Sequence, residues 1–222
     1  NQLFTYCPNI TNMSKILYNC SKVGSNAQNK GIPLGLFYNC TKVQDISLAF
    51  YGCKGLAVVT PGVLHCEVLF SKNLDLVNIS GLFQQSKIEG VLTENPSNSG
   101  YILFPGTKIE NASHLWDGCV MTGVQGDEYI PFVYNSKVLT DISYMFANQT
   151  CFRDLNNMFE GEYSWNNIST YCPALTNCAY LFSKDTELVG NGNTLITALN
   201  KITTLTNHTK AFEGCTKLTD YN

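Results

Sequence analysis

Hydrophobic and polar residues follow one pattern that returns seven times along this chain. Each repeat is centred on an aspartate or asparagine (Asx), with an aliphatic residue two positions before it and a bulky apolar residue five positions after it. The spacings between successive repeat Asx residues are 33, 33, 33, 30, 36 and 30 residues. A nearly fixed period in this range is typical of stacked repeat proteins, whose units bury their apolar faces against one another. The repeat Asx residues are Asn12, Asp45, Asn78, Asn111, Asp141, Asn177 and Asn207.

The residues around each Asx predict a short strand followed by a short helix. An Asx before apolar residues spaced i, i+3, i+4 is a helix N-cap signal, because its side-chain oxygen accepts bonds from amides left unpaired in the first turn. Glycine near the end of the pattern, as at Gly52 and Gly118, is typical of a helix C-terminus. We therefore expect the seven Asx residues to be structural caps. The bulky apolar residues expected in the structural core are Leu17, Phe50, Phe83, Trp116, Phe146, Phe182 and Phe212.

The repeat as a whole predicts an α/β solenoid, an array of coils built from short strands and short helices. It would hold about seven units of about 33 residues in a single domain spanning residues 1–222. Phe37, Phe70 and Leu103 each stand 13 residues ahead of a core residue, so one coil is either the full unit or a smaller piece. Because the chain starts and stops inside a repeat, we expect it to be a fragment of a longer polypeptide.

The composition of the chain limits the classes of partner that we expect it to bind. Hydrophobic residues make up 44% of the chain, enough for a continuous core, while charged residues make up only 14%, well below the usual quarter. A net charge of −3 without a basic cluster gives no support for binding to nucleic acid or to an anionic membrane surface. No apolar run is long enough for a transmembrane helix, so we expect no membrane insertion.

The ten cysteines largely follow the repeat. Cysteines in a repeat column are typical of small buried hydrophobes with free thiols. The alternative is a disulfide such as Cys7–Cys20 or Cys40–Cys53, which an oxidising compartment would favour. The chain contains no CxxC pair, so we predict no metal site. The repeat cysteines are Cys20, Cys53, Cys119 and Cys215 in one column and Cys7, Cys40 and Cys172 in another.

Candidate catalytic chemistry is sparse. His65, His114 and His208 lie in different repeats, and the glycine-rich stretch 190–194 is best interpreted as a flexible turn because it lacks the lysine of a phosphate-binding loop. We therefore predict no catalytic residue and no cofactor. Nine Asn-x-Ser/Thr sequences occur, but four of them use a repeat Asx whose side chain we expect to be bonded to the backbone rather than glycosylated.

Stretches such as ISLAFYGCKGLAVVTPGV, LTDISYMF and HTKAFEGCTKLTDY give the chain a family resemblance. It resembles the BspA-like surface leucine-rich repeats, whose members occur on bacterial and protist surfaces and in phages of gut bacteria. The resemblance implies a leucine-rich-repeat-like right-handed coil array, and it implies adhesion or recognition rather than catalysis. The chain departs from the family pattern in its longer repeat period, in Leu17 in place of phenylalanine, and in three residues that replace the last cysteine of the motif. Those three are Ser86, Gln149 and Asp185.

Two functions compete at this point. The first is a non-enzymatic recognition or adhesion module that binds protein or glycan at an extracellular cell surface or virion surface. Its contacts would lie in the longest unit, in the aromatic-rich stretch 152–167, with Tyr163, Trp165 and Phe152 as candidate ligand-binding residues, unless these rings only pack over a longer loop. The second is a structural spacer or decoration domain of a larger assembly such as a phage particle, whose contacts are with other subunits.

Overall fold

Turns, rather than helices or strands, make up most of this fold. The computed structural model describes residues 4, 7–23, 36–37, 39–57, 70, 72–89, 108–122, 136–150, 154–155 and 165–221. Its strands β1 (Leu56–Ala57), β2 (Lys87–Glu89) and β3 (Val120–Thr122) form a parallel sheet in the order β1-β2-β3, with Leu56 opposite Ile88 and Lys87 opposite Val120. Near the C-terminal end lie the 3-10 helix η2 (Trp165–Asn167) and the α-helices α2 (Ile168–Tyr171) and α3 (Gly192–Leu199).

The predicted fold class, an α/β solenoid of short strands and short helices, is wrong. The described part of the chain is mostly non-regular, and none of its helices follows a repeat Asx. Instead, a run of six turn residues begins two positions after each repeat Asx. The stretch 190–194 is also not a flexible turn, because the side chain of Asn191 accepts the N–H of Asn193 and caps α3.

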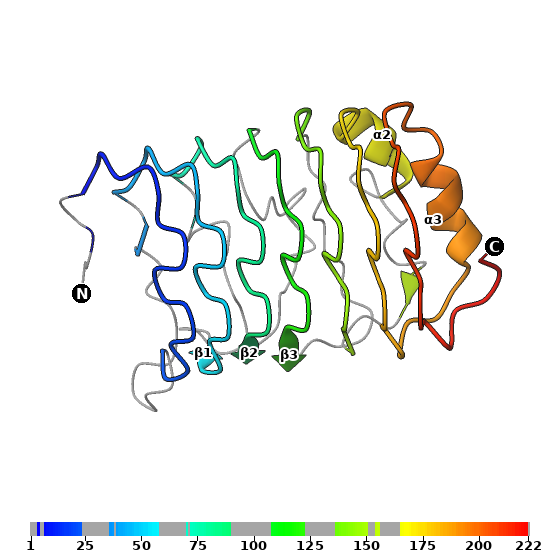
Figure 1. Cartoon of the computed structure of the whole chain (residues 1–222), viewed down its shortest axis with the longest axis horizontal. Coiled ribbons are helices and arrows are strands. Elements are labelled where there is room, and N and C mark those ends of the chain that lie inside the picture. The colour runs from blue at the N-terminus through cyan, green and yellow to red at the C-terminus, as the bar shows by residue number, and fades with distance from the viewer. Residues whose placement is uncertain are drawn as a thin grey trace, which may run out of the picture.

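The repeat Asx residues do lie side by side, and each pairs with the next in a single parallel β-bridge. We number positions within a repeat from its Asx, which is position zero, and we number the repeat segments one to seven. Figure 1 shows the seven segments next to one another in chain order along the long axis of the molecule. The bridges join Asn12, Asp45, Asn78, Asn111, Asp141, Asn177 and Asn207 in that order.

Backbone hydrogen bonds between segments follow a strict alternation. The N–H groups of positions one, three, five and seven donate to the carbonyls of positions zero, two, four and six in the next segment, and all four bonds occur at each of the six steps. The N–H groups in between bond within their own segment, as Ala49 does to Ile46 at 3.1 Å. In segment two the bonds to the next segment run from Ile46, Leu48, Phe50 and Gly52 to Asn78, Ser80, Leu82 and Gln84, at 2.9–3.0 Å.

Two left-handed residues in each segment produce this alternation. Position three has a φ between 55° and 60° in all seven segments, and position seven has a φ between 55° and 81°. A helix needs consecutive right-handed residues, so a left-handed residue at position three ends any helix that the Asx could start. Such a residue costs roughly 1–2 kcal/mol unless it is glycine, which is similar to what one hydrogen bond contributes, so packing must stabilise the segments.

Glycine at position seven has a second role besides its left-handed φ. A Cβ atom on Gly52 would stand 2.2 Å from the side-chain oxygen of Asn19, the residue at the same position in the preceding segment. A Cβ atom on Gly118 would meet the side chain of Gln85 in the same way, at 2.1 Å. The two glycines therefore leave room for the amide side chains of the segments before them.

The repeat Asx residues cap a turn instead of a helix. In every segment the side-chain oxygen of the Asx accepts the backbone N–H of position two, at 2.8–3.2 Å. This side-chain bond is the one that a helix N-cap would make. The left-handed residue at position three, one position later, prevents a helix from following. For the four repeat asparagines that lie within Asn-x-Ser/Thr sequences, Asn12, Asn78, Asn111 and Asn207, this bond occupies the side-chain oxygen.

Aromatic side chains at position five form the spine of the core. Phe50, Phe83 and Trp116 are fully buried and stack face to face, with ring centroids 5.5 and 4.6 Å apart. Phe146 and Phe182 are also fully buried and stack at 5.2 Å, and Phe212, which is 4% exposed, continues the stack at 5.9 Å. Leu17 is the exception, because it is only partly buried.

A second aromatic layer lies beside this spine. Phe37 and Phe70 are fully buried and stack at 5.4 Å, and the edge of the Phe37 ring meets Phe50 at 6.0 Å. The 13-residue echo in the sequence therefore corresponds to a second row of core residues within the same repeat.

In three segments the side chain at position eight binds the backbone of the preceding segment. The thiols of Cys53 and Cys215 donate to position-five carbonyls of that segment, at 3.1 and 3.0 Å, and the side-chain amide of Gln149 makes the same bond. Asp185 takes this position in segment six, is fully buried, and has one carboxyl oxygen without a hydrogen-bond partner. Burial raises the pKa of Asp185 to about 7. Only the protonated carboxylic acid could donate a hydrogen bond to the preceding segment, as Cys53, Gln149 and Cys215 do from the same position.

Replacing an aromatic residue of the core should destabilise the fold far more than replacing its half-buried neighbour. We expect Phe50→Ala to lower the free energy of unfolding by about 3–5 kcal/mol, because it removes a buried ring from the middle of the stack. Tyr51→Ala is the matched control, since this adjacent ring is half-buried, and we expect a loss of about 1 kcal/mol or less. Urea unfolding of both variants measures the difference, and equal losses would mean that the aromatic spine does not stabilise the stack.

The buried acid should make stability depend on pH. Because the pKa of Asp185 is raised to about 7 in the folded chain, its contribution is complete below its ordinary pKa of 3.8 and is lost as the pH rises towards 7. We expect unfolding free energy to fall by about 2–4 kcal/mol over that window relative to Asp185→Asn, which cannot ionise. Parallel curves for the two proteins between pH 4 and pH 8 would contradict this assignment.

Candidate recognition surface

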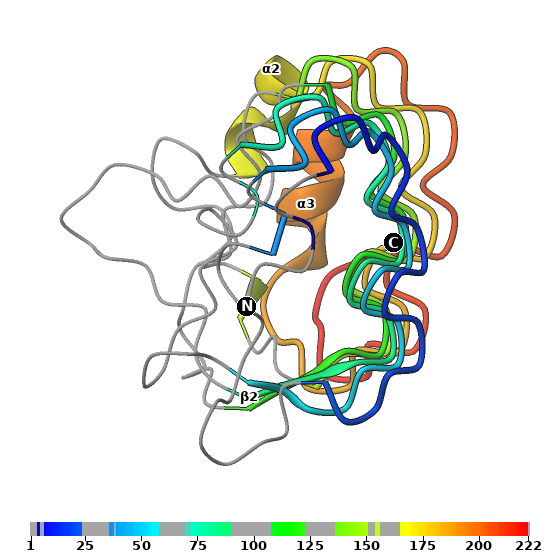
Figure 2. The same cartoon turned by 90° about the vertical axis from the view of Figure 1, so that its left-hand side faces the viewer.

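The side chains at positions three and six form two neighbouring rows along the stack, which we call the outer surface, although Asp117, Ala147 and Ser183 of the second row are buried. Figure 2 shows the seven segments superposed end-on along one side of the molecule, so that equivalent positions line up. Position three is occupied by Lys15, Leu48, Gly81, His114, Tyr144, Tyr180 and Lys210. Position six is occupied by Tyr18, Tyr51, Gln84, Asp117, Ala147, Ser183 and Glu213.

Three aromatic rings follow one another in the first row. His114 stacks on Tyr144 with ring centroids 4.5 Å apart and planes 7° apart, and Tyr144 stacks on Tyr180 at 4.6 Å and 11°. The far face of Tyr180 carries the ammonium group of Lys210, at 5.6 Å from the ring centroid. All three rings are half-buried. The rings follow one another because they occupy position three of successive segments, which lie side by side in the stack.

A second ring pair lies at the other end of the outer surface. Tyr18 and Tyr51, both at position six, stack at 4.6 Å with planes 6° apart, and Tyr18 is 40% exposed. The ammonium group of Lys15 lies 5.9 Å from the centroid of Tyr18. Aromatic residues therefore occupy both ends of the outer surface, with polar side chains between them.

Asp117 organises these polar side chains. One of its carboxylate oxygens accepts from Gln84 at 2.9 Å and lies 2.8 Å from Nδ1 of His114, and the other accepts from Asn148 at 2.6 Å. The carboxylate is only 8% exposed, while the His114 side chain is 37% exposed. The network fixes the orientation of the His114 ring at the start of the aromatic row.

Backbone geometry makes these rings costly to place. His114, Tyr144 and Tyr180 have φ values of 55°, 56° and 58°, where a bulky residue is an outlier, whereas Gly81 takes the same position without that cost. Stacking is worth about 0.5–1.5 kcal/mol for each pair, which offsets much of the strain. Burial, then the Tyr180 ring and nearby acidic groups, raise the pKa of the Tyr144 hydroxyl. The hydroxyl is therefore a neutral donor at physiological pH.

Of the predicted contact residues, the structure describes only Trp165, which does not lie on this surface. Trp165 is only 2% exposed and packs against Phe146 and Phe182, with ring centroids 6.1 and 6.5 Å apart, so its assignment as an exposed ligand-binding residue is wrong. Tyr163 and Phe152 lie outside the described residues. The outer rings had a signal in the sequence, because His114, Tyr144 and Tyr180 share one column of the repeat alignment.

The described cysteines are free thiols, so neither Cys7–Cys20 nor Cys40–Cys53 forms a disulfide. Burial raises the pKa of Cys53 to about 11 and those of Cys119, Cys172 and Cys215 to about 12. A thiol with so high a pKa is protonated at neutral pH and is a poor nucleophile. Among the described residues no group of His, Cys, Asp or Glu side chains has the arrangement of a metal site.

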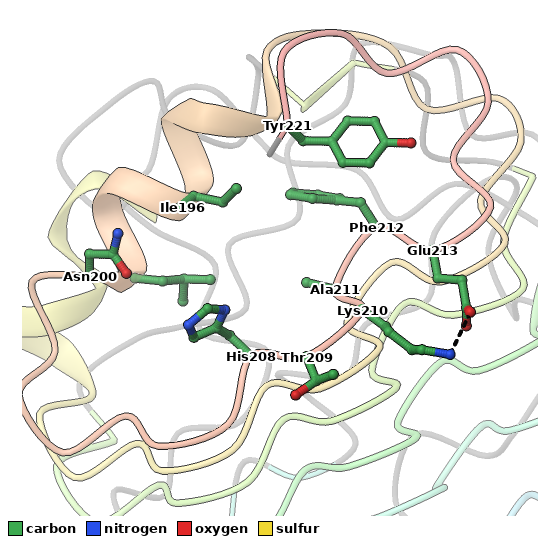
Figure 3. Close-up of a pocket in the computed structure, with 10 residues that line it drawn as sticks. Ile196, Asn200, His208, Thr209, Lys210, Ala211, Phe212, Glu213 and Tyr221 are labelled. Carbon is green, nitrogen blue, oxygen red and sulfur yellow. Dashed lines mark hydrogen bonds and ion pairs between the residues drawn. The ribbon is translucent and has the colours of Figure 1, made fainter.

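A pocket of about 420 Å³ lies at the C-terminal end of the stack, between α3 and segment seven. Figure 3 shows Ile196 of α3 and Asn200, which follows the helix, on one side, and His208, Ala211 and Phe212 of segment seven on the other. Polar residues such as Thr209, Lys210 and Glu213 also line the pocket, but most of its lining surface is apolar.

Comparisons with known proteins give no family for this chain. A scan against protein-family models and a search of the curated proteins both found no match. Within the described residues, no helix is long and apolar enough to cross a membrane.

Proposed function

We propose that this chain is a non-enzymatic recognition module that binds a protein partner through its outer surface. The observation that carries the proposal is the row of three pre-stacked rings, His114, Tyr144 and Tyr180, beside the polar network of Asp117. Rigid amphipathic rings lose little conformational entropy on binding, and they dominate the energy of many interfaces.

The backbone strain at position three supports this role. Glycine is the residue that fits a left-handed position at least cost, and Gly81 shows that the repeat accepts it. Three successive aromatic residues at the same position are therefore not explained by the backbone alone. Strained residues of this kind cluster at functional sites.

The arrangement of the rings favours a protein over a glycan. A sugar stacks on an exposed aromatic face, but both faces of Tyr144 are covered by His114 and Tyr180, and Lys210 lies over the far face of Tyr180. What the row offers is ring edges and tyrosine hydroxyl groups, which suit the mixed apolar and polar surface of a protein.

Three further features fit a module that acts by binding. The sequence resembles the BspA-like surface repeats, which implies adhesion at a cell or virion surface. The low charge of the chain gives no support for a nucleic-acid partner. The buried thiols with raised pKa values are poor nucleophiles, which supports a role without catalysis.

A binding assay tests the proposal. The labelled chain is incubated with a panel of bacterial cells, protist cells and virions, and binding is measured by flow cytometry or co-sedimentation. We expect at least one target to bind, and Tyr144→Ala with Tyr180→Ala to weaken that binding at least tenfold, because the double change removes the centre of the row. Leu74→Ala is the matched control, since this 54% exposed apolar residue lies outside the outer surface.

Treating the target distinguishes the two partner classes. A protein partner predicts that binding disappears after protease treatment of the target and survives enzymatic removal of its glycans. The opposite pattern would make the partner a glycan. If no member of the panel binds, or if Leu74→Ala weakens binding as much as the tyrosine changes do, the outer surface is not a recognition site.

A further inference from the structure

Asp117 fixes which nitrogen of the His114 ring carries the proton. Nδ1 of His114 lies 2.8 Å from a carboxylate oxygen of Asp117, and such an oxygen only accepts hydrogen bonds. Nδ1 therefore carries the proton and donates it. Because a neutral imidazole has a single N–H group, Nε2 of the same ring keeps its lone pair and is a hydrogen-bond acceptor.

A second contact at Nδ1 does not change this assignment. The side-chain amide nitrogen of Gln84 lies 3.4 Å from Nδ1 and is a potential donor to it. The same amide nitrogen lies 2.9 Å from the Asp117 carboxylate, which is the closer acceptor and the charged one. Without a proton on Nδ1, its lone pair would face the carboxylate at 2.8 Å with no hydrogen between them.

The edge of the ring that carries Nε2 is the edge available to a partner. Nδ1 points at Asp117, whose side chain is only 8% exposed, whereas the His114 side chain is 37% exposed. Tyr144 covers one face of the ring. Among the described residues Nε2 has no hydrogen-bond partner. The three-ring row therefore begins with an unused acceptor.

We propose that Nε2 of His114 accepts a hydrogen bond from an N–H or O–H group of the protein partner, and that this bond makes recognition depend on pH. Histidine is the side chain that ordinarily changes its charge between pH 5 and pH 8. A second proton on Nε2 turns the acceptor into a cationic donor, which then faces the partner's own donor. Recognition is therefore strong at neutral pH and weak in mild acid. The inference rests on the proposed function and adds the chemistry of one contact to it.

The surroundings of the His114 ring confine the change to Nε2. From segment three the ring meets the neutral amide of Gln84, and from segment five it meets Tyr144. Burial, as the largest cause, raises the pKa of the Tyr144 hydroxyl, so this group remains neutral between pH 5 and pH 8. Asp117 is the charged group that faces the ring, and it can pair with an imidazolium. The second proton is therefore accommodated without breaking the bond at Nδ1.

Folding and recognition should respond to acid in opposite directions. The pKa of Asp185 is raised to about 7 in the folded chain, so the fold gains stability as the pH falls below 7. Weaker binding in mild acid therefore cannot come from unfolding at Asp185. It would come from the recognition surface itself.

NMR of the imidazole nitrogens in the free chain tests the first step without any partner. We expect His114 at pH 7.5 to show a protonated Nδ1 and an unprotonated Nε2, and to gain a proton at Nε2 on acidification. Loss of these signals in His114→Phe assigns them. A tautomer with the proton on Nε2 at pH 7.5 overturns the inference, whatever the partner is.

Binding at two pH values tests the second step, with the target that the panel of cells and virions identifies. We expect the unaltered chain to bind at least fivefold more weakly at pH 5.5 than at pH 7.5, because an ordinary imidazole is mostly protonated at the lower value. His114→Phe keeps an aromatic ring without the acceptor, so it should bind at least fivefold more weakly at pH 7.5 and show no pH dependence. His208→Gln is the control, since this exposed histidine lies outside the outer surface, and it should keep the pH dependence of the unaltered chain.

These binding data separate the role of Nε2 from the recognition function. Equal binding at both pH values, tighter binding at pH 5.5, or a pH dependence that persists in folded His114→Phe or disappears in His208→Gln overturns the role of Nε2. The recognition function then still stands as long as the changes to Tyr144 and Tyr180 weaken binding. If those changes have no effect, the recognition function fails, while NMR still decides the tautomer of His114. The NMR measurement of the tautomer and the pH series on the unaltered chain need no folded variant.

Discussion

Hydrogen bonds between neighbouring repeat segments are the interaction on which this structure depends. Every second N–H group of a segment points along the stack, and the ones in between close turns within the segment. This alternation requires a left-handed residue at positions three and seven, and the chain has one at both positions in all seven segments. Each left-handed residue other than glycine costs about as much as one hydrogen bond returns, so the stacked aromatic core must supply the remaining stability.

The same alternation arranges the side chains into functional rows. Position five points inward and forms the aromatic spine, while position three points outward and forms the row of His114, Tyr144 and Tyr180. Position eight supplies side chains that bind the preceding backbone. One backbone rule thus creates both the core and the candidate recognition surface.

The sequence was sufficient to predict the repeat register and the core residues of each repeat, because positions that are buried in every repeat carry apolar residues at a regular spacing. It was not sufficient to predict the conformation within a segment. An Asx before apolar residues at i, i+3, i+4 has the same appearance whether a helix or a turn follows, and the deciding residue is position three. The sequence pattern predicts helix ends at Gly52 and Gly118, but these glycines mark the left-handed position seven. Leu48 and Tyr144 give no such sign, because their side chains ordinarily avoid that conformation.

The exposure of Trp165 is mispredicted for a related reason. A local cluster of aromatic residues does not show which of them are buried, and Trp165 proved to extend the core between Phe146 and Phe182. The outer rings are isolated from one another in the sequence and meet only through the stacking of segments. Aligning the repeats reveals their common column, but only the structure shows that this column faces outward.

Through-hydrogen-bond scalar couplings measured by NMR are the most direct test of this account. We predict couplings from the amide nitrogens of Leu48 and Phe50 to the carbonyl carbons of Ser80 and Leu82 in the next segment, and none from these amides to carbonyls four residues earlier. Couplings to the residues four positions earlier, with none to the next segment, would mean that the repeats are helical and that the alternating bonds do not exist.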